Sequence, residues 1–538
     1  MRPHEHLLAR NHERWVALTV LAIGLLLRLG VASTTFFNPD EAMHYFLARQ
    51  PSWIDAYRAS LTSAHPPLLI LIVHYWRMLG DSELVLRLPS VILGAALCWT
   101  AYKWFAQITD FTRALVLLIL LSFSPTLVAL GSELRQYSFL LFFCGLALYQ
   151  LEQALRRQSS RSMLVFSFAL YLALLTHYSS FIFAFLMGIY VLLRFLRSRP
   201  QPAVLATWAG GQALGTGICI LLYRTHIAKL QASGINAIAD TWLRKSFFHE
   251  GQQTILSFLG RATFLVFDYL FAQPVVAGIL LLLFVLGLVA LFRNEPQYPA
   301  LLDRTAFGWY LAGGLILTSI LGIAGLYPYG GSRHDAFLIL FLAPGISLGL
   351  NWAVKGPWRT PVIAAVLMLF AWIFLLPPGA RMKFRDQKLS WMRQAVSYVH
   401  QTVALKSVFL LDNQSTLPFR YYFCRDERVQ FDDEISSPSQ TPQLVQFGCG
   451  GYRVAAGHPS SEASPELWTF SPQELSAALQ QAVEAYRLGA GDRPWFFQTG
   501  WGIETEPALR AHLTRLGCVA PQSFGRNILL CRLAALAQ

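Results

Sequence analysis

The chain has 538 residues, of which 54% are hydrophobic and only 14% are charged, and its mean hydropathy is +0.43. This composition excludes an ordinary soluble fold and indicates an integral membrane protein. The formal net charge of +13 is not accompanied by a basic stripe or an aromatic-basic platform, so we expect no nucleic-acid partner.

Apolar runs long enough to cross a bilayer recur along the chain. A hydrocarbon core of about 30 Å requires roughly 20 apolar residues per helix. The sequence predicts eleven transmembrane helices, near residues 15–33, 85–105, 112–130, 136–152, 162–177, 180–196, 203–222, 274–292, 306–326, 334–353 and 360–377. The apolar segment 254–272 carries Arg261 and Asp268, so we expect it to lie in the membrane interface.

The distribution of basic residues predicts the orientation of these helices. With a cytoplasmic N-terminus, the inside segments hold 15 Lys and Arg residues, whereas three short outside loops hold only Arg135 and Arg333. This asymmetry follows the positive-inside rule, and the predicted location is a cell (inner) membrane. Val31-Ala32-Ser33 resembles a signal cleavage site, but the preceding apolar run is longer than usual, so we expect it to stay as an anchor.

Eleven spans from a cytoplasmic start place residues 380–538 outside. We therefore predict a transmembrane domain, 1–379, with outer loops 34–84 and 223–273, followed by a soluble extracytoplasmic α/β domain. Strands are expected near 407–411, 495–498 and 527–533, and helices from Ser471 to Gly489 and near 505–516. No dinucleotide or Walker signature occurs there, and a stabilising or acceptor-positioning role is favoured over a second catalytic one.

Seven cysteines divide between the two parts of the chain. Cys98, Cys144 and Cys219 lie in predicted spans and are interpreted as packing residues. The other four, Cys424, Cys449, Cys518 and Cys531, lie in the outer domain, where two disulfides can form. Four cysteines allow three pairings, and the sequence does not choose among them.

Polar residues that composition does not require gather on the predicted outer face. They come from five separate stretches: Asp40, Glu41 and His44; His65; Glu133, Arg135 and Tyr137; His177 and Tyr178; Arg333 and His334. A transport pathway would favour ionisable groups at mid-span, and apart from Arg28 the spans have few. Arg28 either snorkels towards the outer face or supports the site.

Four motifs in order carry a resemblance to a known family: Asn-Pro-Asp-Glu at 38–41, Ala-His-Pro-Pro-Leu-Leu at 64–69, Leu-Gly-Asp-Ser-Glu-Leu-Val-Leu-Arg-Leu-Pro-Ser at 79–90, and Glu-Leu-Arg-Gln-Tyr-Ser at 133–138. They resemble the GT-C glycosyltransferases, in the family 39-like branch of protein O-mannosyltransferases, aminoarabinose lipid A transferases and rhizobial lipopolysaccharide galacturonosyltransferases. The resemblance covers about residues 15–200, and the chain from Arg333 onwards only loosely.

The resemblance implies a polytopic α-helical fold with about 11 transmembrane helices. It also implies inverting transfer of a sugar from a polyprenyl-phosphate donor to a cell-envelope glycan, lipid or protein acceptor at the extracytoplasmic face. The alternative function is a flippase or transporter of lipid-linked sugars, which predicts repeated halves and a mid-membrane polar route that the sequence does not display. A catalytically inactive glycolipid-binding relative is a third possibility, against which the presence of Asp40 argues.

Carried over by resemblance, Asp40 matches the general-base position, and the adjacent Glu41 is a second catalytic candidate with a structural or acceptor-orienting role. The alternative for Asp40 is to cap the helix that follows it. The leaving phosphate needs cations or hydrogen-bond donors. His65, Arg135, Arg333 and His334 are the candidates for binding it, although His65 could be a turn residue and Arg333 a snorkelling arginine.

The remaining candidate site residues are His44, Glu133, Tyr137 and His177. If residues 133–137 are helical, Glu133 and Tyr137 share a face and Arg135 is turned away from it. Glu133 could instead form a structural ion pair, and His177 with Tyr178 could belong to an interfacial aromatic belt. No Asp-x-Asp motif occurs in the chain, so we expect metal-independent chemistry without a cofactor.

Overall fold

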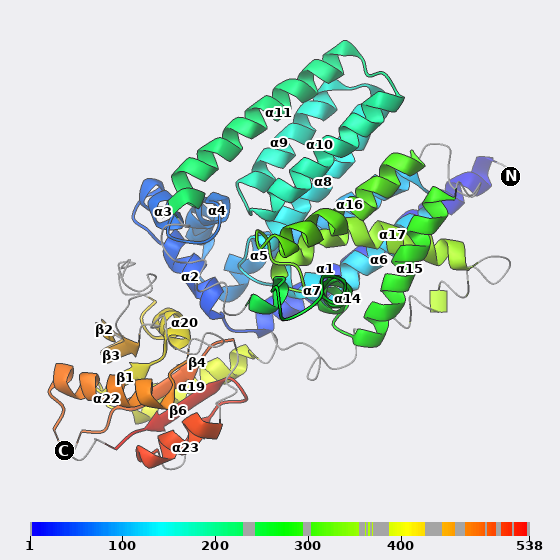
Figure 1. Cartoon of the computed structure of the whole chain (residues 1–538). Helices are drawn as coiled ribbons and strands as arrows, with labels where there is room; N and C mark the ends of the chain where they lie inside the picture. The colour runs from blue at the N-terminus through cyan, green and yellow to red at the C-terminus, as the bar shows by residue number, and fades with distance from the viewer. Residues whose placement is uncertain are drawn as a thin grey trace.

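The computed structural model describes residues 3–229, 243–293, 303–354, 361, 364, 365, 368, 387–425, 444–457, 469–489, 492–501, 507–518 and 521–534. Helices form the first part of the chain and an α/β unit forms the last part (Figure 1). The expected boundary at 379/380 and the expected span 360–377 fall almost entirely outside the described residues.

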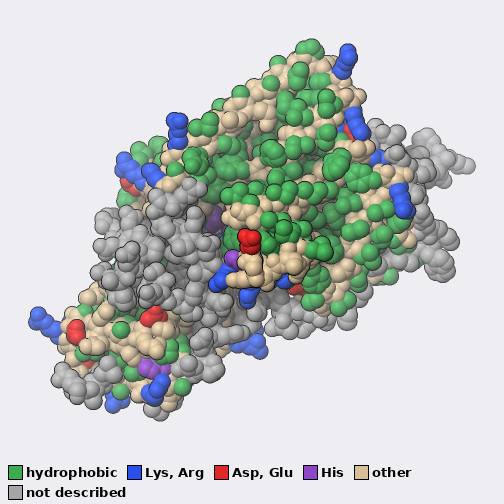
Figure 2. Space-filling view, viewed as in Figure 1, with side chains coloured by type: hydrophobic (Ala, Val, Ile, Leu, Met, Phe, Trp, Pro, Cys, Tyr) green, Lys and Arg blue, Asp and Glu red, His purple; other side chains and the backbone are tan. Residues whose placement is uncertain are grey.

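The described helical part contains eight helices that are long and apolar enough to cross a membrane, namely Asn11–Thr34, Glu83–Ile108, Tyr137–Arg157, Ser179–Arg197, Pro202–Ile227, Pro274–Phe292, Arg304–Ile323 and Arg333–Ala353. Two further predicted spans coincide with shorter apolar helices, Phe111–Phe123 and Ser160–Leu174. Figure 2 shows apolar side chains over the outer faces of the helices, with Lys and Arg near their ends. The prediction of a polytopic helical membrane protein is confirmed.

The secondary-structure bounds in this part are α1 (Pro3–Thr34), α2 (Pro39–Ala48), α3 (Trp53–Ser60), α4 (Leu68–Trp76), η1 (Arg77–Leu79), α5 (Glu83–Ile108), α6 (Phe111–Phe123), α7 (Pro125–Leu130), α8 (Tyr137–Arg157), α9 (Ser160–Leu174), α10 (Ser179–Arg197), α11 (Pro202–Leu222), η2 (Tyr223–Ile227), η3 (Arg244–Ser246), α14 (Ile255–Phe271), α15 (Pro274–Phe292), α16 (Arg304–Ile323), η4 (Arg333–Leu338) and α17 (Ile339–Ala353). The expected outer loop 34–84 is thus largely helical. The location of α14 in the membrane interface stays a prediction.

Contacts between loops show which loops lie together at each end of the helical bundle. At the basic end, where the predicted inside loops meet, Arg197 pairs with Asp303 at 2.5 Å and the amide of Gln201 donates to Gln158 at 2.7 Å. At the opposite end, which we call the α2 end, the amide of Leu68 donates to the carbonyl of Leu175 at 3.0 Å. The α/β unit lies beside α2, and the N-terminus lies far from it (Figure 1). These three contacts agree with the predicted alternation of loops between the two ends.

The expected span 112–130 is broken into α6 and α7 by Ser124 and Pro125. Pro125 has no N–H, so it cannot donate to the carbonyl of Leu121, and the end of α6 leaves further carbonyls open. Arg28 of α1 is buried here and donates to the carbonyls of Leu121 and Ser122, both at 3.1 Å. Two roles were left open for Arg28, snorkelling towards the outer face and supporting the site. The buried side chain bonds the α6–α7 break instead, which argues against snorkelling.

The backbone at Gly131 lies close to the side chain of Arg28. A Cβ on Gly131, at the end of α7, would lie 2.8 Å from the Nε atom of Arg28, so only glycine fits there. The chain then turns at residues 131–136 and enters α8.

The C-terminal unit is a six-stranded mixed sheet with helices on both faces. Its order is β2-β3-β1-β4-β6-β5, and β1 lies parallel to both β3 and β4. Its elements are α19 (Leu389–Thr402), β1 (Val408–Leu411), α20 (Asn413–Phe423), β2 (Leu444–Cys449), β3 (Tyr452–Gly457), α22 (Pro472–Tyr486), β4 (Trp495–Thr499), α23 (Pro507–Arg515), β5 (Gln522–Ser523) and β6 (Ile528–Arg532).

Successive side chains of β1 point to opposite faces of the sheet and pack in two separate hydrophobic cores. Phe409 and Leu411 pack with α19 and α20, whereas Leu410 packs with α22 and α23 on the other face. The predicted strands and helices of this unit are confirmed, including the capping box at Ser471, whereas β2, β3, β5, α19 and α20 were not expected.

The two disulfides join Cys424 to Cys449 and Cys518 to Cys531, with Cα–Cα distances of 4.9 Å and 5.6 Å. The first ties the end of α20 to the end of β2, and the second ties the segment after α23 to β6. This is one of the three pairings that the sequence allowed. Cys98, Cys144 and Cys219 are free thiols in helices, as predicted.

Replacing Arg28 should test whether it holds the α6–α7 break. Arg28→Met leaves two buried carbonyls without their donor, so we expect about 2 kcal/mol lower stability and a lower unfolding temperature in detergent. Arg58→Met, which removes an exposed arginine of α3, is the control. Equal unfolding temperatures for the two variants would contradict the role given to Arg28.

Candidate active site at the α2 end

Helix α2 begins with a capping box that leaves Asp40 free for other contacts. The side chain of Asn38 accepts from the amide of Glu41 at 3.0 Å, and the Glu41 carboxylate accepts from the amide of Asn38 at 3.2 Å. Pro39 occupies the first helical position, where its missing N–H costs nothing. The cap is therefore Asn38, and the alternative in which Asp40 caps the helix is wrong.

The carboxylate of Glu41 pairs with Arg87 of α5. Two charge-assisted hydrogen bonds of 2.7 Å join them, from Nε to Oε1 and from Nη2 to Oε2, and both side chains are 1% exposed. Oε1 also accepts from the amide of Leu134 at 2.8 Å. Both oxygens of Glu41 thus hold α2 against α5 and the turn before α8.

Arg87 also holds the end of α1. Its guanidinium donates to the carbonyls of Ala32 at 2.9 Å, Thr35 at 2.8 Å and Phe36 at 3.1 Å. A buried charge is tolerated when it is paired and its remaining donors are satisfied. Arg87 of α5 therefore holds the end of α1 and the start of α2, which are distant from it in sequence.

Asp40 projects from the first turn of α2 between two arginines. One oxygen, Oδ2, accepts from Arg333 at 2.8 Å and also from Arg135, and the Asp40 side chain is 14% exposed. Burial alone raises the pKa of Asp40, but the charges of Arg135 and Arg333 outweigh burial and hold the pKa below its usual range. Asp40 is thus an ionised carboxylate facing two cations, and Arg333 is an ion-pair partner rather than a snorkelling residue.

Residues 131–136 form a turn, and α8 starts only at Tyr137. The expectation that Arg135 is turned away from Glu133 and Tyr137 on one helix is therefore wrong. In the turn, Arg135 reaches Asp40 and its guanidinium lies 5.4 Å from the centre of the Tyr137 ring. The turn brings Arg135 into the site.

Glu133 lies next to the pair of Glu41 and Arg87. These three residues line a small cavity together with Val31, Thr35, Ala129 and Gln387. Burial and the charge of Glu41 raise the pKa of Glu133 to about 7. Near neutral pH, the carboxyl of Glu133 is therefore partly protonated. No ion pair of Glu133 occurs among the described residues, so the alternative in which Glu133 forms a structural ion pair is not supported.

Four histidines from four segments lie next to Asp40 and its arginines. Their ring centres are 6.3 Å apart for His44 and His65, 5.1 Å for His65 and His177, and 6.0 Å for His177 and His334. The ring of Tyr137 lies 5.2 Å from His177. His177 is 2% exposed, so it packs in this cluster and does not belong to an aromatic belt.

The buried histidines of this cluster are uncharged near neutral pH because their pKa values are lowered. Burial, with the charge of Arg135, lowers the pKa of His44 and of His177 to about 3, and burial with the neighbouring His177 lowers the pKa of His65 well below its usual value. A contact between His65 and phosphate would therefore involve a neutral donor. Arg135 and Arg333 remain as the cations.

Two of the buried polar groups in this cluster are donors without a protein acceptor among the described residues. The amide of Ser179 donates to Nδ1 of His177 at 3.0 Å, which places the imidazole proton on Nε2. Within the described chain, this Nε2 and the hydroxyl of Tyr137 have no hydrogen-bond partner. Such groups are uncommon in folded proteins and are suited to hydroxyl groups of a ligand.

Sequence reasoning missed Arg87 and Asp335. Asp335 holds the segment before Arg333, because its carboxylate accepts from the amides of Gly331 and Ser332, both at 2.9 Å. Gly331 has φ +83°, and a Cβ there would lie 2.3 Å from the carbonyl oxygen of Leu265. Arg87 could have been identified from the sequence, because it lies inside the predicted span 85–105, and a charged residue inside an apolar span needs a partner.

No group of three or more His, Cys, Asp and Glu side chains in the described residues is arranged to hold a metal ion. The expectation of metal-independent chemistry stays a prediction.

Comparisons with known proteins agree with the class suggested by the fold and site. Residues 64–210 match the family model of dolichyl-phosphate-mannose-protein mannosyltransferases. This range includes His65, Arg135, Tyr137 and His177 but neither Asp40 nor Arg333. No curated protein matches the chain in sequence.

The structure is similar to ArnT from Cupriavidus metallidurans in the apo state, with 11% identity and a TM-score of 0.52, over 97% of this chain and 98% of that chain. ArnT bound to undecaprenyl phosphate matches with 12% identity and a TM-score of 0.44, over 97% and 99%. The Saccharomyces cerevisiae Pmt1-Pmt2 complex bound to the sugar donor matches with 16% identity and a TM-score of 0.32, over 39% and 33%.

The match to apo ArnT, over nearly the whole of both chains, gives the fold: the chain has the fold of the GT-C membrane glycosyltransferases. The resemblance identified from the four sequence motifs is confirmed at this level.

A double-mutant cycle should reveal the coupling between Glu41 and Arg87. Arg87→Met leaves a carboxylate buried without its partner, and we expect it to lower stability by about 3–5 kcal/mol. Glu41→Gln combined with Arg87→Met should cost less than the sum of the two single variants. Additive losses of unfolding free energy would contradict the coupling.

The buried histidines His44 and His177 should contribute a loss of stability as the pH is lowered from 6.5 to 5. The unfolded chain binds protons at His44 and His177 in this range, whereas the folded chain, with pKa values of about 3, does not. Each histidine should contribute about 1 kcal/mol of loss per pH unit. His177→Gln should reduce this slope in thermal unfolding measured against pH, and an unchanged slope would be inconsistent with a neutral buried His177.

Proposed function

We propose that the protein transfers a sugar, with inversion, from a polyprenyl-phosphate donor to a glycan, lipid or protein acceptor at the extracytoplasmic face of a cell membrane. The observation that carries the proposal is the Asp40 carboxylate between Arg135 and Arg333 at the α2 end. The family model supports the donor class, because its description names a dolichyl-phosphate sugar. The positive-inside asymmetry supports an extracytoplasmic α2 end.

The chemistry of inverting transfer matches the groups present. An acceptor oxygen forms a bond to the anomeric carbon while Asp40 takes the proton from the acceptor hydroxyl. The bond between the anomeric carbon and the phosphate oxygen breaks, and its electron pair stays on the phosphate. Arg135 and Arg333 stabilise the charge that develops there. Attack from the face opposite the leaving phosphate inverts the anomeric centre.

Donor binding would change the state of Asp40. In the absence of a donor, both arginines bind the Asp40 carboxylate and keep it a weak base. A phosphate that binds the same guanidinium groups competes for them, and the pKa of Asp40 then rises towards its ordinary value. The carboxylate thus becomes a better proton acceptor only when the donor is in place.

The sugar is expected to contact the neutral groups beside the arginines. The Nε2–H of His177 and the hydroxyl of Tyr137 are buried donors that suit sugar hydroxyls. Because Glu41 is fully engaged with Arg87, we assign it a positioning role rather than a contact with the reacting atoms.

Transfer assays with a series of polyprenyl-phosphate sugars test the proposal. Asp40→Asn should lower kcat by about 10²–10⁴-fold, because it removes the base. Arg333→Ala should lower kcat/KM for the donor by about 10²-fold, whereas Arg58→Ala, at an exposed arginine, should not change it. Equal transfer by Asp40→Asn and the unaltered protein would exclude Asp40 as the base, and transfer from a nucleotide sugar without lipid would contradict the donor class.

A further inference from the structure

The C-terminal unit contacts the helix that carries Asp40. Helix α20 lies against α2 (Figure 1). The buried ring of Tyr421 packs 4.6 Å from the ring of Phe37 and 5.1 Å from the ring of Tyr45, measured between ring centres. Aromatic contacts of this kind fix the orientation of the partners as well as burying apolar area.

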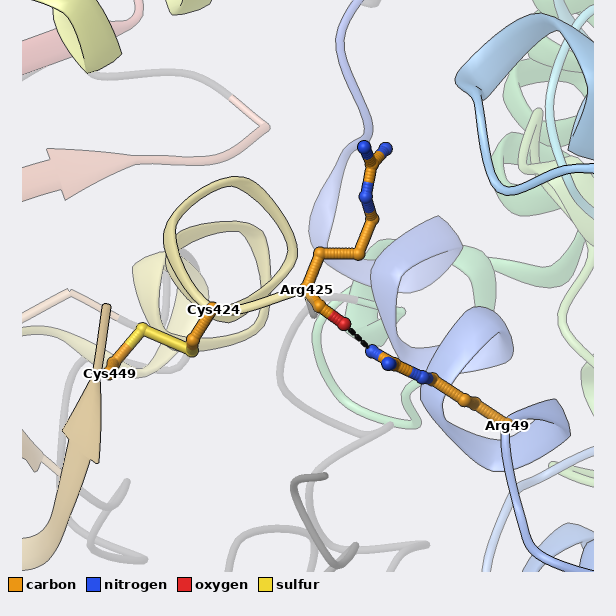
Figure 3. Close-up of a disulfide and its surroundings, with 4 residues drawn as sticks. All are labelled: Arg49, Cys424, Arg425 and Cys449. Atoms are coloured by element: carbon orange, nitrogen blue, oxygen red, sulfur yellow. Dashed lines mark hydrogen bonds between the residues drawn. A yellow bond between two sulfur atoms is a disulfide. The ribbon is translucent and has the colours of Figure 1, made fainter. Parts of the chain in front are cut away.

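Hydrogen bonds from the α20 segment reach both ends of α2. At the start, the amide of Phe37 donates to the hydroxyl of Tyr422 at 2.9 Å, three residues before Asp40. At the far end, Arg49, the C-cap residue of α2, donates to the carbonyl of Arg425 (Figure 3). The helix is therefore held at two points about one α2 length apart.

A third contact joins the same segment to the loop before α5. The hydroxyl of Tyr421 donates to the carbonyl of Asp81 at 2.6 Å, and Arg425 donates to the same carbonyl at 3.3 Å. Tyr45 of α2 donates to the Asp81 carboxylate at 3.3 Å. Asp81 thus bridges α2 and α20.

The Cys424–Cys449 disulfide lies within this contact. In the sequence Cys424 lies between Tyr422 and Arg425. Its disulfide partner, Cys449, ends β2 (Figure 3). The bond therefore fastens the end of α20, and with it the carbonyl that binds Arg49, to the sheet. The second disulfide, Cys518–Cys531, lies in the core between the sheet and the helices α22 and α23.

We propose that α20 and Arg425, fastened by the Cys424–Cys449 disulfide, form a positioning element that holds α2 so that Asp40 points at the reacting groups. Tyr422 and Arg49 are the positioning residues in this assignment. The inference rests on the proposed function, because Asp40 is its catalytic group. It gives the C-terminal unit a part in the transfer step in addition to any part in acceptor binding.

The effect should fall on kcat rather than on the donor KM. Under the proposed function, the phosphate is bound by Arg135, in the turn before α8, and by Arg333 of η4. None of the contacts described above joins α20 to either arginine. Displacement of Asp40 by a fraction of an ångström weakens proton transfer without removing the cations. A contact that only stabilises the fold would instead lower the unfolding temperature and leave kcat per folded molecule unchanged.

Three substitutions in the full-length protein test this proposal, with the polyprenyl-phosphate sugar that supports transfer as the probe. Tyr422→Phe and Arg49→Ala should each lower kcat by about tenfold with donor KM within about twofold. Arg49→Lys keeps a donor for the Arg425 carbonyl and should restore most of the activity. Tyr486→Phe is the matched control, because it removes a hydroxyl that donates to the carbonyl of Val454 within the C-terminal unit.

The disulfides offer a second matched pair. Cys424→Ser with Cys449→Ser should lower kcat, whereas Cys518→Ser with Cys531→Ser should leave kcat per folded molecule unchanged. Equal effects of the two pairs on kcat, or unchanged kcat in Tyr422→Phe and Arg49→Ala, would overturn the positioning role.

Hydrogen exchange separates failure of this proposal from failure of the proposed function. Tyr422→Phe should increase amide exchange in residues 39–48 relative to Tyr486→Phe, whether or not a donor is known. Faster exchange without any transfer from polyprenyl-phosphate sugars would contradict the function and retain the positioning contact. Unchanged exchange would contradict the positioning contact itself.

Discussion

The structure at the α2 end depends on the buried ion pair between Glu41 and Arg87. Two charges are removed from water there, and this is tolerated because Arg87 uses its remaining donors on the carbonyls of Ala32, Thr35 and Phe36. The pair holds α1, α2 and α5 together at the point where the chain leaves the helical bundle. The capping box of α2 uses the same carboxylate, so the start of the helix and its place on α5 are set by one side chain.

Asp40 precedes Glu41 in the first turn of α2, and its carboxylate meets Arg135 and Arg333, which arrive from two other segments. The arginines stabilise the carboxylate and thereby suppress its basicity. Under the proposed function, the phosphate of the donor relieves this suppression, which couples the activation of the base to the presence of the leaving group.

Much of the helical architecture could be predicted from the sequence, because hydrophobic length and basic asymmetry act locally. Ten of the eleven predicted spans coincide with described helices, and the loop residues of the site do meet at one end. The orientation of Arg135 could not be predicted, since the turn at 131–136 depends on the break at Pro125 and on the Glu41 carboxylate that accepts from its backbone. Helix α20 was missed because Pro418 and a weak apolar pattern gave little helical signal. The disulfide pairing likewise depends on the order of the strands in the sheet, which cannot be predicted from the spacing of the cysteines.

A high-resolution structure of the protein with a polyprenyl phosphate would test the central claim most directly. The account predicts phosphate oxygens within hydrogen-bond distance of the guanidinium groups of Arg135 and Arg333, with the Asp40 carboxylate released from at least one of them and the Glu41–Arg87 pair unchanged. A phosphate bound away from both arginines, with Asp40 still paired to each, would contradict it.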